Sequence, residues 1–124
     1  MPSGYTMPAI SVLMTVYNGY NHVGSAIDSI LNQTFGNFEF IIVDDGSTDQ
    51  TASLIENYSK TDDRIRLIAT KNSGQTSALN TGLSYCRAKY IARQDADDVS
   101  LRHRLEIQYR LINADDDRIL VGSR

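Results

Sequence analysis

The sequence predicts an α/β fold, a mostly parallel sheet flanked by helices. Short apolar runs that suit buried strands alternate with stretches whose apolar residues recur at helical spacing. Pro8 is the last proline, so no proline interrupts a later helix or a central strand. A strand, a helix and a second strand in succession form a right-handed crossover, which makes the two strands parallel. The alternation therefore predicts a Rossmann-like sheet with helices on both faces.

The elements follow one another from residue 8, after a loose lead-in over residues 1–7. The second helix begins after Ser47, Thr48 and Asp49, whose side chains suit an N-cap. The expected strands cover residues 10–16, 38–43, 65–69, 90–93 and 119–121. The expected helices carry the apolar positions Val23, Ile27, Ile30 and Leu31; Ala52, Ile55 and Tyr58; Leu79, Leu83 and Cys86; and Leu105, Tyr109 and Ile112. Residues 8–124 are thus expected to form one domain.

The composition excludes several classes of protein. The chain has 124 residues, 41% of them hydrophobic and 22% charged, with a formal net charge of -3. That charge argues against a nucleic-acid partner bound through the phosphate backbone. The single cysteine, Cys86, excludes an intrachain disulfide and a cysteine-rich metal site, and its helical position predicts a core residue. No apolar run reads as a secretory signal or membrane span, so we expect the cytoplasm or its membrane face.

Ligands of parallel sheets bind outside the carboxyl ends of the strands, so the residues after each strand are the candidates for chemistry. All four loops there are polar, and two are acidic. The loops consist of residues 17–19, 44–48, 71–74 and 95–98. Five carboxylates should therefore converge on one edge of the sheet, those of Asp44, Asp45, Asp95, Asp97 and Asp98.

Clustered carboxylates repel one another unless a cation lies among them. Asp95 and Asp97 at a strand end favour a hard divalent cation, Mg²⁺ or Mn²⁺, whereas Asp98 also suits a helix cap. One of Asp44 and Asp45 suffices for the turn and cap, which leaves the other free to bind a ligand.

The remaining candidates carry weaker signals. Asn72 and Gly74 allow backbone N–H groups to approach a phosphate, although a simple loop explains them equally well. Neither glycine-rich nucleotide-binding motif is present in the sequence. His22 and His103 are isolated, and Asp115, Asp116 and Asp117 suit a solvated turn. Arg102 and Arg104 are expected to pack along the last helix, with contact to a pyrophosphate as the alternative.

The strand-end motifs, taken together and in order, resemble those of family-2 glycosyltransferases with the GT-A fold. The most specific are Gln33-Thr34-Phe35, Asp44-Asp45-Gly46-Ser47 and Asp95-Ala96-Asp97. The likeness covers nearly the whole chain from Pro8, through residues 10–18, 26–35, 38–49, 72–74, 80–83 and 90–98. Arg102 stands where the family usually has proline, which affects the helix start and not the chemistry.

The resemblance implies a transferase that takes a sugar from a nucleotide-diphosphate donor, a UDP-sugar, to an acceptor hydroxyl with inversion. Asp45 would bind the base, Asp44 would support it, Asp95 would face the ribose, and Asp97 would coordinate Mn²⁺ or Mg²⁺ between the phosphates, with Asp95 as a second acid at the metal. The base pocket would be lined by Thr15, Val16, Tyr17 and Asn18. The implied nucleotide site also includes Asn72, Gly74 and Ala96.

The resemblance also implies what the chain lacks. The general base is expected beyond residue 124, in the acceptor-binding half, so we expect a truncated, N-terminal, donor-binding part. Its acceptor would be a saccharide or a lipid-linked sugar. The open sheet edge left by truncation favours self-association, and a homodimer is expected.

Two other functions stay open at this point. One is a non-catalytic module that binds nucleotide sugars. The other is a Mg²⁺-dependent phosphatase like the haloacid dehalogenases, whose D-x-D-x-[TV] pattern residues 95–99 also fit. That motif follows the first strand in the phosphatases, whereas here it follows the fourth.

Overall fold

The computed structural model describes residues 7–113 and confirms the α/β prediction. Its strands are β1 (Ile10–Val16), β2 (Phe38–Asp45), β3 (Ile65–Thr70) and β4 (Tyr90–Arg93). Its helices are α1 (Tyr20–Leu31), α2 (Thr51–Thr61), α3 (Gln75–Tyr85) and α4 (Arg104–Asn113). The strand expected at 119–121 and the turn at residues 115–117 lie outside the described residues.

All four strands run parallel, in the spatial order β3-β2-β1-β4. The chain thus moves outward from β1 through β2 to β3, then returns to place β4 on the other side of β1. A ligand crevice is expected where the strand order reverses in this way. The carboxyl end of β1, between those of β2 and β4, is therefore the position to examine.

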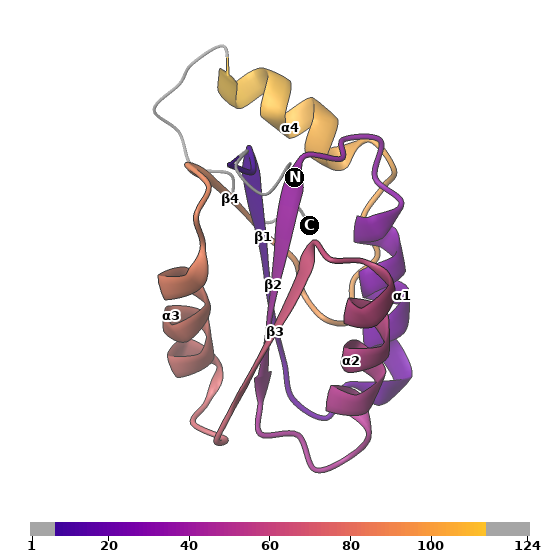
Figure 1. Ribbon diagram of the computed structural model, residues 1–124, viewed down its shortest axis with the longest axis vertical. Coiled ribbons are helices and arrows are strands. Elements are labelled where there is room, and N and C mark those ends of the chain that lie inside the picture. Colours follow the sequence, from indigo (N-terminus) through magenta and orange to yellow (C-terminus); the bar gives the residue numbers. More distant parts are fainter. Residues whose placement is uncertain (1–6, 114–124) are drawn as a thin grey trace.

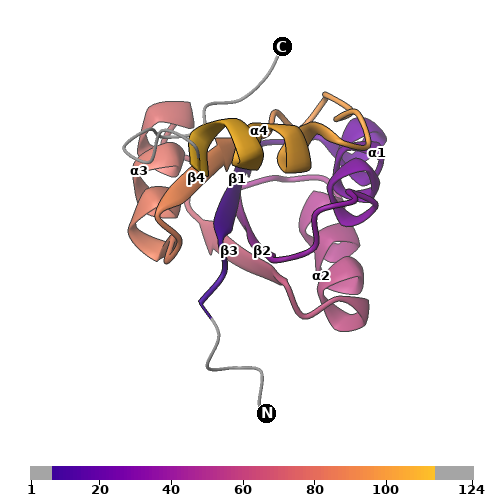
Figure 2. The same cartoon turned by 90° about the horizontal axis from the view of Figure 1, so that it is seen from above.

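Helices cover both faces of the sheet. Figure 1 shows α1 and α2 on one side and α3 on the other, with α4 at the top of the view. The same layers are visible from above in Figure 2. Because β1 and β2 are buried on both faces, their sequences read as nearly continuous apolar runs.

Alternate residues of the central strands enter two separate cores. Val12, Phe40 and Ile42 belong to the larger core, which α1, α2 and α4 share. Leu13 and Ile41 point to the opposite face and belong to a smaller core with α3. Burying such side chains fully stabilises the fold by about 1.5–3 kcal/mol each.

Three details differ from the sequence-based expectation. Strand β2 extends through Asp44 and Asp45, because both residues pair with β3. Helix α2 begins later than expected, at Thr51, whose backbone N–H donates to the Asp49 carboxylate over 2.9 Å. The prediction that Cys86 lies within a helix was wrong, because Cys86 follows the last turn of α3. Its side chain is half-buried and packs against the smaller core.

A buried carboxylate joins β2 to the loop before β4. Glu39 is buried, and its carboxylate accepts hydrogen bonds from the backbone N–H of Arg87 at 2.7 Å and from its Nε at 2.9 Å. The Ser11 hydroxyl also donates to Glu39, and accepts from the Ala88 N–H. This cluster fixes the entry of the chain into β4, and hence the position of the loop that follows β4.

The Glu39→Ala substitution should destabilise the protein by about 3 kcal/mol, because it leaves buried donors without an acceptor and the Arg87 guanidinium without its partner. The free energy of unfolding from urea titration checks this. Glu56→Ala, at an exposed position of α2, is the control and should change it by less than about 0.5 kcal/mol. Equal stabilities of the two variants would contradict this role of Glu39.

Candidate functional site

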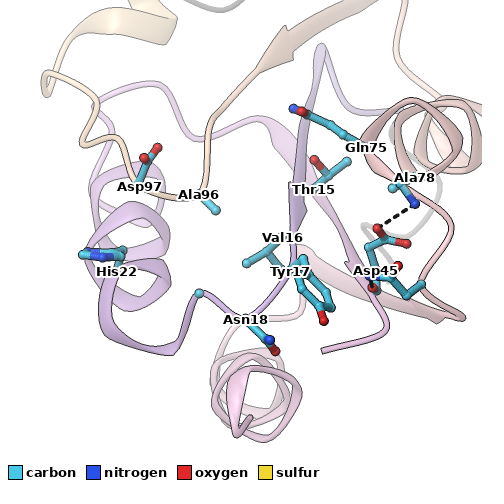
Figure 3. A pocket seen from close by; sticks show the side chains of 13 residues that line it. Thr15, Val16, Tyr17, Asn18, His22, Asp45, Gln75, Ala78, Ala96 and Asp97 are labelled. Carbon is cyan, nitrogen blue, oxygen red and sulfur yellow. Dashed lines mark hydrogen bonds between the residues drawn. The ribbon is translucent and has the colours of Figure 1, made fainter. Parts of the chain in front are cut away.

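A cavity of about 480 Å³ lies at the carboxyl end of β1, where the strand order reverses. We call it the strand-end pocket, and Figure 3 shows the side chains that line it. Its volume is in the range of small-molecule sites in proteins. Nine of the residues nominated from the sequence line it: Thr15, Val16, Tyr17, Asn18, Asp45, Asn72, Gly74, Ala96 and Asp97.

Two nominated residues, Asp44 and Asp95, lie off the pocket wall, and four residues to which the sequence analysis gave no binding role lie on it. Gly19 and His22 come from the start of α1, and Gln75 and Ala78 from the first turn of α3. A helix that starts at a strand end brings its first turn to the same edge, so the strand-end rule applied to whole turns would have found His22, Gln75 and Ala78, whereas Gly19 already belongs to the loop of residues 17–19.

The turn after β1 is tied to the loop after β2. Asn18 has a φ of 52°, a left-handed conformation that asparagine tolerates better than most residues. Its side-chain Oδ1 accepts from the backbone N–H of Thr48 at 2.8 Å, and its own N–H donates to the Ser47 hydroxyl, also over 2.8 Å. The neighbouring Tyr17 is 50% exposed and lines the pocket.

Asp49 extends this tie to two helices. The hydrogen bond from the Thr51 hydroxyl is the main reason why the pKa of the Asp49 carboxyl lies below its usual value, and the backbone N–H of Thr51 adds to this effect. The same carboxylate accepts from the Tyr20 N–H at the start of α1 over 3.4 Å. The first turns of α1 and α2 therefore keep a fixed relation beside the pocket.

The adjacent acids at the end of β2 have different partners. Asp44 is buried and accepts from the backbone N–H of Ser47 at 3.3 Å, so it forms the turn. Asp45 accepts from the backbone N–H groups of Ser73 at 2.8 Å and Gly74 at 3.0 Å. Asp45 thereby holds the loop between β3 and α3, and because each carboxylate oxygen has two lone pairs, it retains acceptor capacity toward the pocket.

Gly46 allows these two loops to meet. Its φ is +73°, and a Cβ atom there would lie 2.5 Å from the backbone nitrogen of Asn72. Both facts exclude a larger residue without movement of the backbone. The loop carrying Asn72 and Gly74 can therefore approach Asp45 only because residue 46 is glycine.

Gly46→Ala should destabilise the protein by about 2 kcal/mol, through backbone strain and the clash with Asn72. Chemical denaturation measures this change. Gly36→Ala is the matched control, since the nearest atom to its added Cβ is the end of the Arg64 side chain at 4.0 Å. A Gly46→Ala protein as stable as the Gly36→Ala protein would show that the loop does not need this close approach.

Three carboxylates gather on the loop after β4, which we call the acidic loop (residues 95–98). Oxygen atoms of Asp95, Asp97 and Asp98 lie within 4.8 Å of one another, with Asp97 and Asp98 exposed and Asp95 half-buried. Among residues 7–113, Asp95 forms a salt bridge with Arg93, whose Nε lies 3.8 Å from Asp95 Oδ1. Hard carboxylate oxygens of this number fit Mg²⁺ or Mn²⁺. Asp97 is shared by this cluster and the pocket wall.

The described lining of the pocket includes no lysine or arginine. Its ionisable side chains are Asp45, Asp97, His22 and Tyr17, of which two are acids. An anionic ligand would therefore meet repulsion unless a cation accompanied it. The arrangement suits a ligand with an uncharged part beside Tyr17 and a charged part that binds with a metal ion near Asp97.

Known proteins with similar sequences and structures indicate which family this fold and pocket belong to. A sequence model of the family described as Glycosyl transferase family 2 matches residues 11–124. The chain belongs to this family. An uncharacterized glycosyltransferase of Haemophilus influenzae is 40% identical over 117 residues, which are 94% of this chain and 36% of that protein. Glycosyltransferase GlyG of Streptococcus pneumoniae is 32% identical over 115 residues, 92% of this chain and 38% of the relative. The chain thus spans less than half of these family-2 relatives.

Solved structures confirm the GT-A fold. The TarS 1-349 structure of S. aureus in complex with UDP-GlcNAc matches 85% of this chain and 31% of its own, with a TM-score of 0.80 and 27% identity. The mannosyltransferase PcManGT of Pyrobaculum calidifontis, in complex with GDP-Man and Mn²⁺, matches 80% of this chain and 30% of its own. Its TM-score is 0.67 and its identity 26%. Both neighbours thus hold nucleotide sugars.

Proposed function

We propose that the strand-end pocket binds the nucleotide of a sugar donor, a UDP-sugar, with the diphosphate directed toward the acidic loop. The observation that carries this proposal is the sharing of Asp97 between the pocket wall and the carboxylate cluster. A nucleotide has the two parts that the site requires, an aromatic base and a charged diphosphate. The complexes of TarS with UDP-GlcNAc and of PcManGT with GDP-Man support the same ligand class.

In this proposal the base lies against Tyr17, within the wall formed by Thr15, Val16 and Asn18. Asp45 accepts a hydrogen bond from the base through its remaining lone pairs, while Asp44 keeps the turn in place. Asn72 and Gly74 close the pocket from the loop that Asp45 fixes. Asp95 lies off the pocket wall in the structure and would face the ribose of the bound donor, and Ala96 lines the pocket between the two acids.

The carboxylates of Asp95 and Asp97 would hold Mn²⁺ or Mg²⁺, and the oxygen-only donor set fits such an ion. The bound cation would neutralise the charge that develops on the departing nucleoside diphosphate. The acids themselves select against a free diphosphate, since they repel an anion that arrives without a metal ion.

We further propose that the parent activity is transfer of the sugar, a hexose, to a saccharide or lipid-linked acceptor with inversion. Inversion by direct attack needs a general base near the acceptor hydroxyl. The expectation that this base lies beyond residue 124 stays a prediction, as do the homodimer, the domain boundary at residue 8 and action at the cytoplasmic membrane face. None of the helices described between residues 7 and 113 combines the length and the apolar character that a membrane span requires.

The competing functions differ in their support. Family membership leaves the phosphatase without support, and the acidic loop follows β4 and not β1. A non-catalytic module that binds nucleotide sugars remains the alternative, because it would use the same pocket. Transfer of sugar to an acceptor separates the two, whereas donor binding is common to both.

Calorimetric titration with UDP, GDP and TDP, each with and without Mn²⁺, tests the donor site. We expect the tightest binding for UDP with Mn²⁺, because the metal ion removes the repulsion between diphosphate and acids. Asp97→Ala should lose this metal dependence, with at least about a ten-fold weaker affinity in the presence of Mn²⁺.

Asp63→Ala, an exposed acid remote from the pocket wall, is the control and should bind like the wild type. Equal affinity of the wild type for UDP with and without Mn²⁺ would contradict the role of the metal ion. Absence of binding to any of the three nucleotides would contradict the donor site itself.

A further inference from the structure

The charged side chain of Arg104 is buried behind the acidic loop. Arg104 is the first residue of α4 and is only 7% exposed. Its Nη1 donates to Gln94 Oε1 at 2.9 Å and to the Ser100 hydroxyl at 3.0 Å, and its Nη2 donates to the Arg93 carbonyl at 2.8 Å. One guanidinium thus binds the end of β4 and both sides of the loop, although the sequence analysis expected simple packing along the helix.

Gln94 transmits this hold to the acidic loop itself. It is 3% exposed, and its Nε2 donates to the backbone carbonyls of Asp95 at 3.1 Å and Asp98 at 2.8 Å. The loop closes further through the Asp98 N–H, which donates to the Asp95 carbonyl at 3.1 Å. Both ends of the acidic loop are therefore bound to one buried amide, which Arg104 in turn orients.

The Gln33-Thr34-Phe35 motif, in the segment that follows α1, fixes the same stretch of chain. Gln33 is buried, and its Nε2 donates to the Leu101 carbonyl at 2.6 Å while its Oε1 accepts from the Leu105 N–H at 2.9 Å. One turn earlier in α1, the Ser29 hydroxyl accepts from the Ser100 N–H at 3.0 Å. Gln33 and Ser29 thus hold the stretch between the acidic loop and α4 in place by hydrogen bonds. The role of Gln33 in the motif is to fix this stretch.

Burial of Arg104 is costly without a function for it. Burial lowers the pKa of its guanidinium, and the nearby Asp95 and Asp98 raise it. Its hydrogen-bond acceptors are the side-chain amides of Gln94 and Gln108, the Ser100 hydroxyl and the Arg93 backbone carbonyl, none of which is a carboxylate. Burying a charged group that has no carboxylate partner costs stability, so packing alone does not favour an arginine here. What the planar guanidinium adds is geometry, since its N–H groups reach four acceptors at once.

We propose that Gln94 and Arg104 are positioning residues that preorganise the acidic loop for its divalent cation, and that Gln33 holds this unit against α1. The proposal rests on the proposed function, because it takes the acidic loop as the metal-binding element. Preorganisation matters here because three carboxylates that repel one another would otherwise spread apart. Mutation of residues that form hydrogen bonds to metal ligands commonly lowers metal affinity by roughly 10- to 100-fold.

The test measures the affinity for UDP with and without Mn²⁺ in two conservative variants. Gln94→Glu keeps the acceptor for Arg104 and loses both donated hydrogen bonds. Arg104→Lys keeps the charge and loses the fork. In each, the gain in UDP affinity from Mn²⁺ should fall by about ten-fold or more, while the affinity without metal changes less than about two-fold. Arg110→Lys, the same change at an exposed position of α4, is the control and should behave like the wild type.

Thermal unfolding of each variant establishes that it is folded. If either fails to fold, Ser100→Ala, which removes one neutral partner of Arg104, replaces it and should show a smaller loss of the metal-dependent gain. A merely structural role would lower the melting temperature and leave that gain unchanged, which would overturn the proposal. A wild type without any metal-dependent gain would instead contradict the proposed function.

Discussion

Repulsion among the carboxylates of the acidic loop is the constraint on which the site depends. Asp95, Asp97 and Asp98 keep oxygen atoms within 4.8 Å of one another, although like charges at that distance favour separation. The hydrogen bonds from Gln94 to the backbone of this loop oppose that separation. The acids are thus held at a spacing that suits a divalent cation, at the edge of a pocket that would otherwise repel a diphosphate.

The rest of the architecture places other groups around this loop. The parallel sheet brings the ends of β1, β2 and β4 to one edge, and the reversal of strand order at β1 opens the pocket there. Side chains from one loop then accept hydrogen bonds from the backbone of the next, as Asn18 does from Thr48 and Asp45 from Gly74. These links join the separate strand-end loops into one surface around the pocket.

Much of this could be predicted from the sequence, because its signals are local. The apolar periods located the four strands within two residues, and the strand-end rule found most of the pocket wall. The division of labour between Asp44 and Asp45 was not predictable, since adjacent acids look alike until their partners are known. The role of Arg104 was also missed, because its partner Gln94 stands ten residues earlier, just after β4, and only the tertiary fold brings the two side chains together.

Anomalous diffraction at the manganese edge, from crystals grown with UDP and Mn²⁺, is the most direct measurement of the central claim. We expect one strong anomalous peak in contact with the Asp97 carboxylate and with the diphosphate, and the uracil ring beside Tyr17. A nucleotide bound in the pocket with no manganese near Asp97, or manganese on the acidic loop with the nucleotide elsewhere, would contradict it.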